Sequence, residues 1–201
     1  MSKLPTILII TFSCLMSACG KSGSGGGGTP ITDEVTAKAA FLKINSLWTA
    51  TLKPALTKEA QKYADFALNG GTGGKAVVNG SFSKTSASSS TSSTNSSLVD
   101  VTITFQQYET DGLRLDGVLR FFDSYSYRMA CGSAGCASST KTSISYSSED
   151  GYGVAFPPVA IKFNSNGTDL SDAILMDAGK SLAHWSVKVT NKSGKVITFS
   201  Y

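Results

Sequence analysis

Two kinds of hydrophobic spacing divide the chain. Between residues 32 and 69 apolar residues recur every three or four positions, whereas from residue 75 onward they alternate with polar residues. The first spacing produces an apolar stripe along a helix, and the second produces one apolar face along a strand. The sequence therefore predicts a single α+β domain at 31–201, helical at 32–69 and β-rich at 75–201.

The helical part is expected to contain a kink. Thr32 is a suitable N-cap residue for a first helix, and Pro54 should end or kink this helix near Leu52. The apolar stripe of the first helix consists of Ala37, Phe41, Ile44, Trp48 and Leu52. The apolar face of a second helix consists of Leu56, Ala60, Tyr63 and Ala67. Because the polar faces carry no band of Lys and Arg, we expect the stripes to pack on a sheet rather than on a membrane.

The β-rich part contains seven alternating stretches. They lie at 76–82, 99–105, 113–121, 144–146, 159–163, 185–189 and 197–201. Short turns separate them, and this favours antiparallel pairing because parallel strands need long crossovers. We therefore expect an antiparallel meander of about seven or eight strands, for which a curved or half-barrel form is one option. Residues 83–97 show no periodicity and are expected to form a mobile loop between two strands.

Two cysteines lie close together in the β-rich part. Cys131 and Cys136 enclose four small residues between two strand-like runs. In an oxidising compartment this spacing predicts a disulfide across the tip of a hairpin. A redox-active pair is the alternative, but such a pair normally has two intervening residues and lies at a helix N-terminus, and the sequence indicates neither feature.

The first residues have the pattern of an export signal. Lys3 gives a positive start, and the apolar run at 4–16 is shorter than the roughly 20 residues that span a bilayer. The end of this run and the residues after it read MSAC at 16–19, which resembles the lipobox of bacterial lipoproteins. The resemblance implies a signal peptide at 1–18 and a Cys19 that is acylated and becomes the N-terminus after cleavage. Cys14 fits less well because bulky Phe12 precedes it, and an ordinary cleavable signal with an incidental cysteine is the alternative.

The residues after Cys19 agree with this interpretation. The stretch at 20–30 is rich in glycine and serine, and its eleven residues predict a flexible tether with an r.m.s. span of roughly 18 Å. Such a tether would hold a folded domain clear of the lipid headgroups. By the sorting rule of the lipoprotein family, Gly20 in place of an aspartate implies the outer membrane rather than the inner one.

Charge and histidine content exclude several classes of function. The formal charge of +4 becomes +3 when Lys3 leaves with the signal peptide, and the basic residues are not clustered, so no nucleic-acid partner is expected. The single histidine, His184, rules out a histidine-rich metal site, and no motif supplies it with the partners of a catalytic triad. Carboxylate pairs such as Glu149-Asp150 are expected to be solvated loop charges.

Three motifs resemble functional loops without matching their spacing. The run at 69–76 lacks the first glycine and the final Ser or Thr of a phosphate-binding loop. Around Ser133, Cys131 occupies the first glycine position of a nucleophile elbow. The run at 164–172 resembles a calcium loop, but its twelfth position is Leu175 rather than a carboxylate. The first and third runs are therefore expected to be turns, and no cofactor is predicted.

Three classes of function remain. The anchor, the tether and the failed motifs favour a non-catalytic envelope lipoprotein whose domain binds another protein or a polymer. A carrier of hydrophobic ligands or lipids is the main alternative, because a helix and a curved antiparallel sheet can enclose an apolar cavity, as in the half-barrels of periplasmic lipoprotein carriers. A hydrolase would need polar groups that converge in a pocket. An open apolar cavity in the structure would distinguish the carrier from the envelope lipoprotein.

Overall fold

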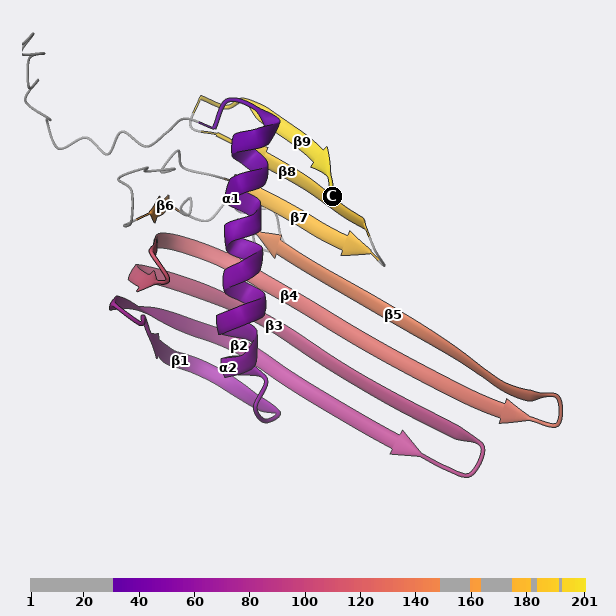
Figure 1. Ribbon diagram of the computed structural model, residues 1–201. Coiled ribbons are helices and arrows are strands. Elements are labelled where there is room, and N and C mark those ends of the chain that lie inside the picture. The colour runs from indigo at the N-terminus through magenta and orange to yellow at the C-terminus, as the bar shows by residue number, and fades with distance from the viewer. Residues whose placement is uncertain (1–30, 149–159, 164–174, 182–183, 192) are drawn as a thin grey trace, which may run out of the picture.

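A helical segment lies across one face of an antiparallel sheet in the computed structural model of the protein (Figure 1). The structure describes residues 31–148, 160–163, 175–181, 184–191 and 193–201. The helical segment consists of α1 (Glu34–Leu47), the π-helical turn η1 (Trp48–Leu52) and α2 (Lys53–Leu56). The strands are β1 (Gln61–Asn69), β2 (Gly73–Ser88), β3 (Ser92–Thr110), β4 (Leu113–Gly132), β5 (Gly135–Ser147), β6 (Ala160–Phe163), β7 (Leu175–Ser181), β8 (His184–Thr190) and β9 (Val196–Ser200).

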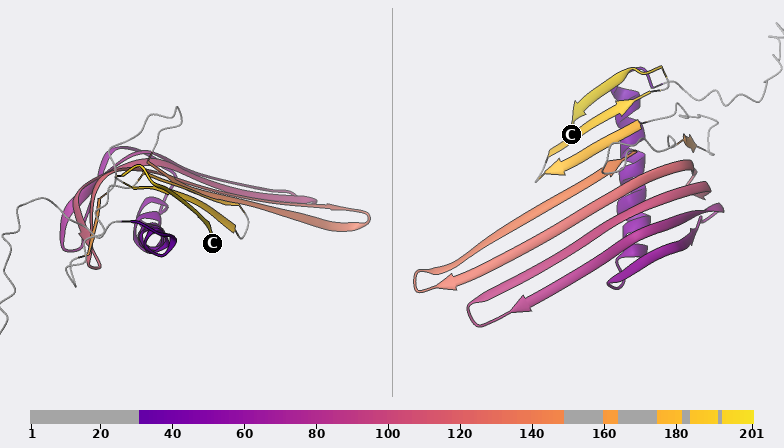
Figure 2. Two further views of the ribbon diagram at one scale, coloured as in Figure 1. Left: turned by 90° about the horizontal axis from the view of Figure 1, so that it is seen from above. Right: turned by 180° about the vertical axis from the view of Figure 1, so that it is seen from behind.

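The strands form a meander, which confirms the predicted α+β class. Among the described residues the sheet order is β1-β2-β3-β4-β5-β7-β8-β9, every neighbouring pair is antiparallel, and short β6 pairs with one end of β4. The turn between β3 and β4 consists of Asp111 and Gly112, whose φ angles of 48° and 72° suit the tight hairpin turn that Asp-Gly favours. Viewed from above, the sheet curves around the helix at one end and straightens into long hairpins at the other (Figure 2).

The first helix begins one residue later than the N-cap prediction. Asp33, rather than Thr32, is the N-cap, and its Oδ1 accepts a hydrogen bond of 2.9 Å from the backbone N–H of Thr36. The Thr36 hydroxyl accepts in return from the backbone N–H of Asp33, completing a capping box. The hydrogen bonds from Thr36 hold the pKa of Asp33 below its usual value. A carboxylate satisfies these free N–H groups, and its charge also suits the positive end of the helix dipole.

Pro54 distorts the helix without ending it near Leu52. A π-helical turn, η1, precedes the proline, and the backbone N–H of Lys53 donates to the carbonyl of Trp48 five residues earlier. In a regular helix the proline ring would clash with the carbonyl four residues before it, so a wider turn at this point relieves the clash. The helical segment then continues to Leu56.

The second predicted helix is wrong: residues 61–69 form the edge strand β1. The helical spacing of Tyr63 and Ala67 is coincidental, because β1 contains a bulge with Asp65 at a φ of 51°. The bulge shifts the strand alternation by one residue, so Tyr63 is buried and Phe66 lies on the same face of the sheet. Tertiary pairing with β2 outweighs the local helix preference of this stretch.

The predicted loop at 83–97 is also wrong, because most of it extends two strands. β2 continues to Ser88 and β3 begins at Ser92, leaving a short connection at 89–91. Ser83 to Ser88 pair in unbroken register with Leu98 to Ser93. The stretch lacks an apolar period because neither of its faces is buried in the core. Its strands still form, because backbone hydrogen bonds between β2 and β3 do not require apolar side chains.

The helix and the sheet share one hydrophobic core. All five residues of the predicted first stripe are buried, and Trp48 stacks on Phe121 of β4 with ring centroids 4.5 Å apart. Phe41 meets Trp185 of β8 edge to face at 5.0 Å. Tyr146 of β5 lies between these pairs, and burial, together with the nearby negative charge of Asp123, raises its pKa well above the usual value. The core therefore lies between the helical segment and the curved part of the sheet.

One buried carboxylate fixes the C-terminal part of the helical segment to the sheet. Asp123 of β4 is only 4% exposed, and its Oδ2 lies 2.5 Å from Nζ of Lys53 and 3.4 Å from Nε1 of Trp48. Both partners come from the helical segment. A buried carboxylate needs such partners, so this cluster sets where the helix crosses β4.

Candidate binding surface

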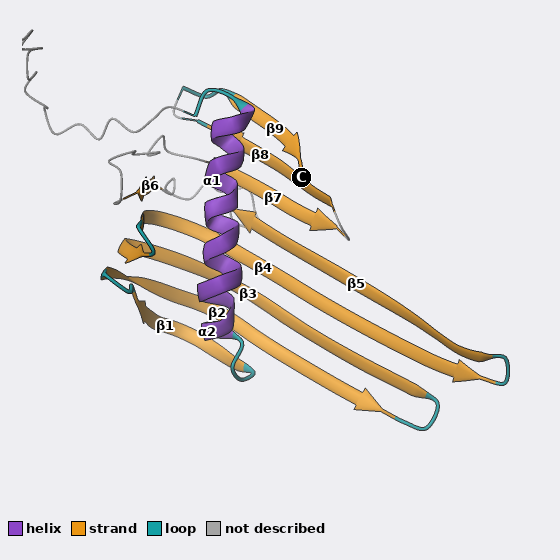
Figure 3. Cartoon of the chain, in the orientation of Figure 1, coloured by secondary structure: helices purple, strands orange, loops and turns teal. Residues whose placement is uncertain are grey.

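Four strands continue beyond the helical segment as a sheet that no described element covers (Figures 1 and 3). The last row containing buried residues pairs Phe82 of β2, Val99 of β3, Asp123 of β4 and Ile144 of β5. We call the continuation the projecting sheet, which comprises residues 83–88, 92–98, 124–132 and 135–143. Its residues are all exposed or half-buried. The described part of the chain therefore leaves both faces of the projecting sheet uncovered.

The face on the helix side carries a line of large side chains along β4. Phe121 and Asp123 point toward the helical segment, so Tyr125, Tyr127 and Met129 follow on the same face at alternate positions. Their register neighbours on β3 and β5 are small and polar. These neighbours are Ser97 and Thr142 beside Tyr125, Asn95 and Thr140 beside Tyr127, and Ser93 and Ser138 beside Met129. We call this set the tyrosine face.

The two tyrosines differ from the aromatic residues of the core. Tyr125 is 39% exposed and Tyr127 is half-buried, and within the described ranges neither ring contacts another aromatic ring. Neither hydroxyl has a hydrogen-bond partner among the described residues. In contrast, the hydroxyl of Tyr146 lies 2.7 Å from Oδ1 of Asn45, to which it donates. Within the described part of the chain, the rings and hydroxyls of Tyr125 and Tyr127 are therefore available for a ligand.

The projecting sheet has an uneven charge. It contains no Asp or Glu, but it contains Lys84, Arg128 and Lys141. Lys84 of β2 pairs with Ser97 and thus extends the tyrosine face onto β2, whereas Arg128 and Lys141 lie on the outer face, by strand alternation. Carboxylates such as Asp100 and Asp116 are found instead on the covered part of the sheet, where Arg120 and Arg114 pair with them. The net charge of the projecting sheet is therefore positive.

Apart from Ser143, which pairs with Ser181 of β7, the two side edges of the projecting sheet have no described partner strand. β1 pairs with β2 only as far as Phe82, and β7 pairs with β5 only as far as Ser143. Lys84 and Lys141 lie on these two outer strands, where a charge discourages pairing with another chain. The unpaired backbone of these edges could accept another strand, but the two lysines make such pairing less favourable.

The predicted cysteine pair lies at the tip of the longer hairpin. Cys131 of β4 and Cys136 of β5 are register partners, and their sulfur atoms lie 2.03 Å apart, at the distance of a disulfide bond. Ser133 and Ala134 form the turn between them. The link joins the two strands at the end of the hairpin, where the strand residues are exposed or half-buried and none of the described core residues lies. The disulfide therefore holds β4 and β5 together at the outer end of the tyrosine face.

Replacing both cysteines, Cys131→Ala with Cys136→Ala, is expected to lower the free energy of unfolding by at most about 2 kcal/mol, because the closed loop is short. The protein should remain folded, and amide hydrogen exchange should accelerate in the hairpin tip but not in the core strands. Peptide mass spectrometry of unreduced exported protein should find the two cysteines linked. Two free thiols in folded exported protein would contradict the disulfide.

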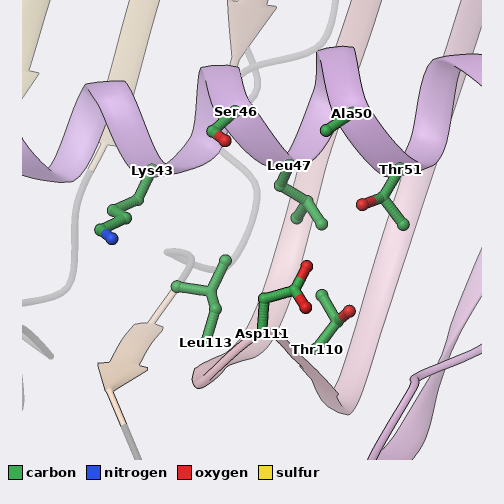
Figure 4. Close-up of a pocket in the computed structure, with 8 residues that line it drawn as sticks. All are labelled: Lys43, Ser46, Leu47, Ala50, Thr51, Thr110, Asp111 and Leu113. Carbon is green, nitrogen blue, oxygen red and sulfur yellow. The ribbon is translucent and has the colours of Figure 1, made fainter. Parts of the chain in front are cut away.

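A hollow between the helix and the turn of β3 and β4 is too small for a lipid (Figure 4). Its volume is about 90 Å³, and pockets that hold drug-sized ligands usually have roughly 300 Å³ or more. Lys43, Ser46 and Thr51 line one side, and Thr110 and Asp111 line the other. Polar groups thus make up much of the lining, which does not suit an acyl chain.

The only histidine does not lie within a catalytic arrangement in the described part of the chain. His184 is exposed on β8 and borders an open hollow of about 360 Å³. The other lining residues are Ser143, Gly179, Lys180, Trp185, Ser186 and Ser200, and none of them is a carboxylate. Among the described residues there is also no group of three His, Cys, Asp or Glu side chains that could hold a metal ion.

Several predicted features can now be placed. Of the run at 69–76, only residues 70–72 form the expected turn between β1 and β2, because 73–76 already belong to β2, where Gly74 with a φ of +66° lies against the backbone of Gln107. Ser133 lies in the tip of a hairpin, away from His184 of β8. Cys19, Glu149-Asp150 and the run at 164–172 lie outside the described residues. The tyrosine face was not predicted, although the alternation in SYSYRM at 124–129 is a strand signal.

Comparisons with protein-family models, with curated proteins and with solved structures gave no match. Within the residues that the structure describes, no helix is both long enough and apolar enough to span a membrane.

Proposed function

We propose that this protein is a lipid-anchored envelope protein with a non-catalytic binding domain, and that the projecting sheet is its binding surface. The lipobox-like sequence ending in Cys19 and the glycine-rich tether support the anchor. By the sorting rule given above, the protein would reside in the outer membrane. The partner would be another component of the cell envelope, either a protein or a polymer.

The projecting sheet is the observation that carries this proposal. Three or more strands normally need one buried apolar face to be stable, yet these four strands bury neither face against the described residues. Their length is therefore not explained by the needs of the core. A disulfide at the tip, and tyrosine hydroxyls that bond to none of the described residues, are features suited to a rigid contact surface.

The position of the helix favours a binding domain over a lipid carrier. A carrier must leave the concave face of its sheet open, whereas here Phe41, Trp48 and Leu52 of the helical segment are buried in the core that they share with the sheet. The hollow beside the helix, at about 90 Å³, is also below the usual size of a ligand pocket, and the larger one at His184, at about 360 Å³, is open to solvent rather than enclosed.

Shortening both hairpins tests the proposed surface. Ser83 is paired with Leu98, and Ser124 is paired with Ser143, so Asn-Gly can replace 84–97 and 125–142 as two-residue turns without altering the register. The full chain, extracted in non-ionic detergent, should sediment with detergent-washed envelope fragments. The shortened chain should lose about tenfold or more in apparent affinity, because the contacts that hold the partner are gone.

Thermal unfolding provides the control for this test, because the shortened chain keeps every core residue and should still unfold cooperatively. Equal sedimentation of the two folded chains would contradict the proposed surface, and so would failure of the unaltered chain to sediment.

A further inference from the structure

We propose that the tyrosine face binds an extended polysaccharide chain, and that it prefers chains with acidic groups to neutral ones. This inference rests on the proposed function and names the ligand of the same surface. Tyr125 and Tyr127 would pack their rings against successive sugar units. The hydroxyl and amide side chains on either side would bind the sugar hydroxyls.

The side chains that flank the tyrosines match the chemistry of sugar hydroxyls. A sugar hydroxyl both donates and accepts hydrogen bonds, and so do serine, threonine and asparagine side chains. Every register neighbour of Tyr125 and Tyr127 is one of these three residue types. On β2, the next strand outward, Ser86 lies opposite Asn95 and Lys84 lies opposite Ser97. The ligand would thus meet hydrogen-bonding groups on both sides of the aromatic line.

The tyrosines supply a platform of suitable shape. Side chains on one face of a strand repeat about every 7 Å, so Tyr125 and Tyr127 lie about one such repeat apart along β4. Tyrosine offers a large ring with little conformational freedom to lose and a hydroxyl at its edge. A polymer with repeating units can follow such a line across the strand direction or along it, whereas a compact ligand would need a concave pocket.

Other classes of ligand fit this face less well. Protein interfaces are enriched in tyrosine but depleted of serine, whereas here serine, threonine and asparagine surround each tyrosine. A membrane surface would select a continuous apolar band of Trp, Phe and Leu, whereas the tyrosine face has none of these three residue types and is mostly hydroxyl-bearing. Nucleic acid would need clustered cations, and Lys84 is the single cation among the residues of this face.

The charge of the projecting sheet indicates the preference for acidic chains. With three basic residues and no carboxylate, its field attracts an anionic polymer. Lys84 can meet an acidic group directly on the tyrosine face, while Arg128 and Lys141 on the outer face add only longer-range attraction. The rings and hydroxyls should therefore provide most of the affinity, and the charges should provide the preference.

Binding of two defined polysaccharides tests this inference. The full chain, in non-ionic detergent, would be applied to immobilised alginate, an acidic polyuronate, and to immobilised dextran, a neutral polyglucan. We expect binding to both, with the higher affinity for alginate. The double change Tyr125→Ala with Tyr127→Ala should weaken both by about tenfold or more, because both ring contacts are lost. Tyr125→Phe with Tyr127→Phe should give an intermediate loss, since the rings remain.

Two control variants separate the ring contacts from other effects. Phe66→Ala is the matched control, because Phe66 is 38% exposed, close to the 39% of Tyr125, but lies on β1 outside the projecting sheet. It should leave binding to both polysaccharides unchanged. Lys84→Gln should weaken binding to alginate and leave binding to dextran unchanged, because only the acidic chain meets its charge.

Three results would overturn the inference. The first is binding to neither polysaccharide, and the second is equal binding by the wild type and the Tyr→Ala double variant. The third is binding to alginate alone that disappears in about 0.5 M salt, because this would indicate charge attraction without ring contacts. Sedimentation of the shortened chain reports on the proposed function separately. If shortening abolishes envelope binding while neither polysaccharide binds, the surface is correct and the ligand class is wrong.

Discussion

Replacing Trp48 by alanine is expected to lower the free energy of unfolding by about 4 kcal/mol, because a large fully buried side chain leaves a cavity that the core cannot refill. Trp48 has no exposed surface, stacks on Phe121 at 4.5 Å, and donates from Nε1 to Asp123 at 3.4 Å. The substitution thus removes the aromatic contact and one of the two partners of a buried carboxylate. The second loss adds to the cavity, since a buried charge with fewer hydrogen bonds is costly.

Urea unfolding should show the loss as a lower midpoint at an unchanged slope, and the melting temperature should fall by about 12 °C for a chain of this size. Val35→Ala is the control. Val35 lies on the same helix but is 78% exposed, so its replacement should change the stability by no more than about 0.5 kcal/mol. A loss below about 1 kcal/mol for Trp48→Ala would show that this residue does not hold the helix on the sheet.

The sequence was sufficient to predict the secondary structure and its buried face where the pattern of apolar side chains coincides with burial in the core. The stripe through Phe41 and Trp48 predicted the face of the helix that is buried, and the alternation at 99–105 and 113–121 predicted the two strands beneath it. In these elements one face meets the core and the other meets solvent. Hydrophobic periodicity reports that difference directly, and so the prediction was correct.

Residues 57–69 show why a correct-looking pattern can mislead. Leu56, Tyr63 and Ala67 have helical spacing, but the strand is an edge strand, and the bulge at Asp65 interrupts its alternation. Neither the edge position nor the bulge leaves a two-residue period in the sequence. Pairing of 61–69 with β2 is a tertiary contact, and local propensity carries no information about it.

The projecting sheet was missed for a different reason. Residues 83–97 contain almost no apolar side chains, and low-complexity serine stretches usually indicate a loop. Here the register of β2 with β3, fixed by core residues such as Val78 and Ile103, continues into the serine stretch as an unbroken ladder. The tyrosine face could have been inferred from SYSYRM only if its neighbouring strands had been known.

Replacing Cys19 by serine is expected to move the protein from the membrane fraction to the membrane-free supernatant. The proposed anchor joins two or three acyl chains to this cysteine, and two chains hold a protein stably on a bilayer where one chain is only marginal. Serine has no thiol to accept the diacylglyceryl group, so the variant loses all chains at once. Carbonate-washed membranes and metabolic labelling with an alkyne fatty acid would measure the anchor and its acylation.

Cys14→Ser is the matched control for the anchor, because Cys14 is the other cysteine of the first 30 residues and is preceded by bulky Phe12 rather than by small residues. It should remain labelled and membrane-bound. The domain of the Cys19→Ser protein should still bind envelope fragments, since the projecting sheet is unchanged and lies far along the chain from the anchor. Unchanged attachment to carbonate-washed membranes, or retained label in Cys19→Ser, would show that the MSAC sequence is not a lipidation site.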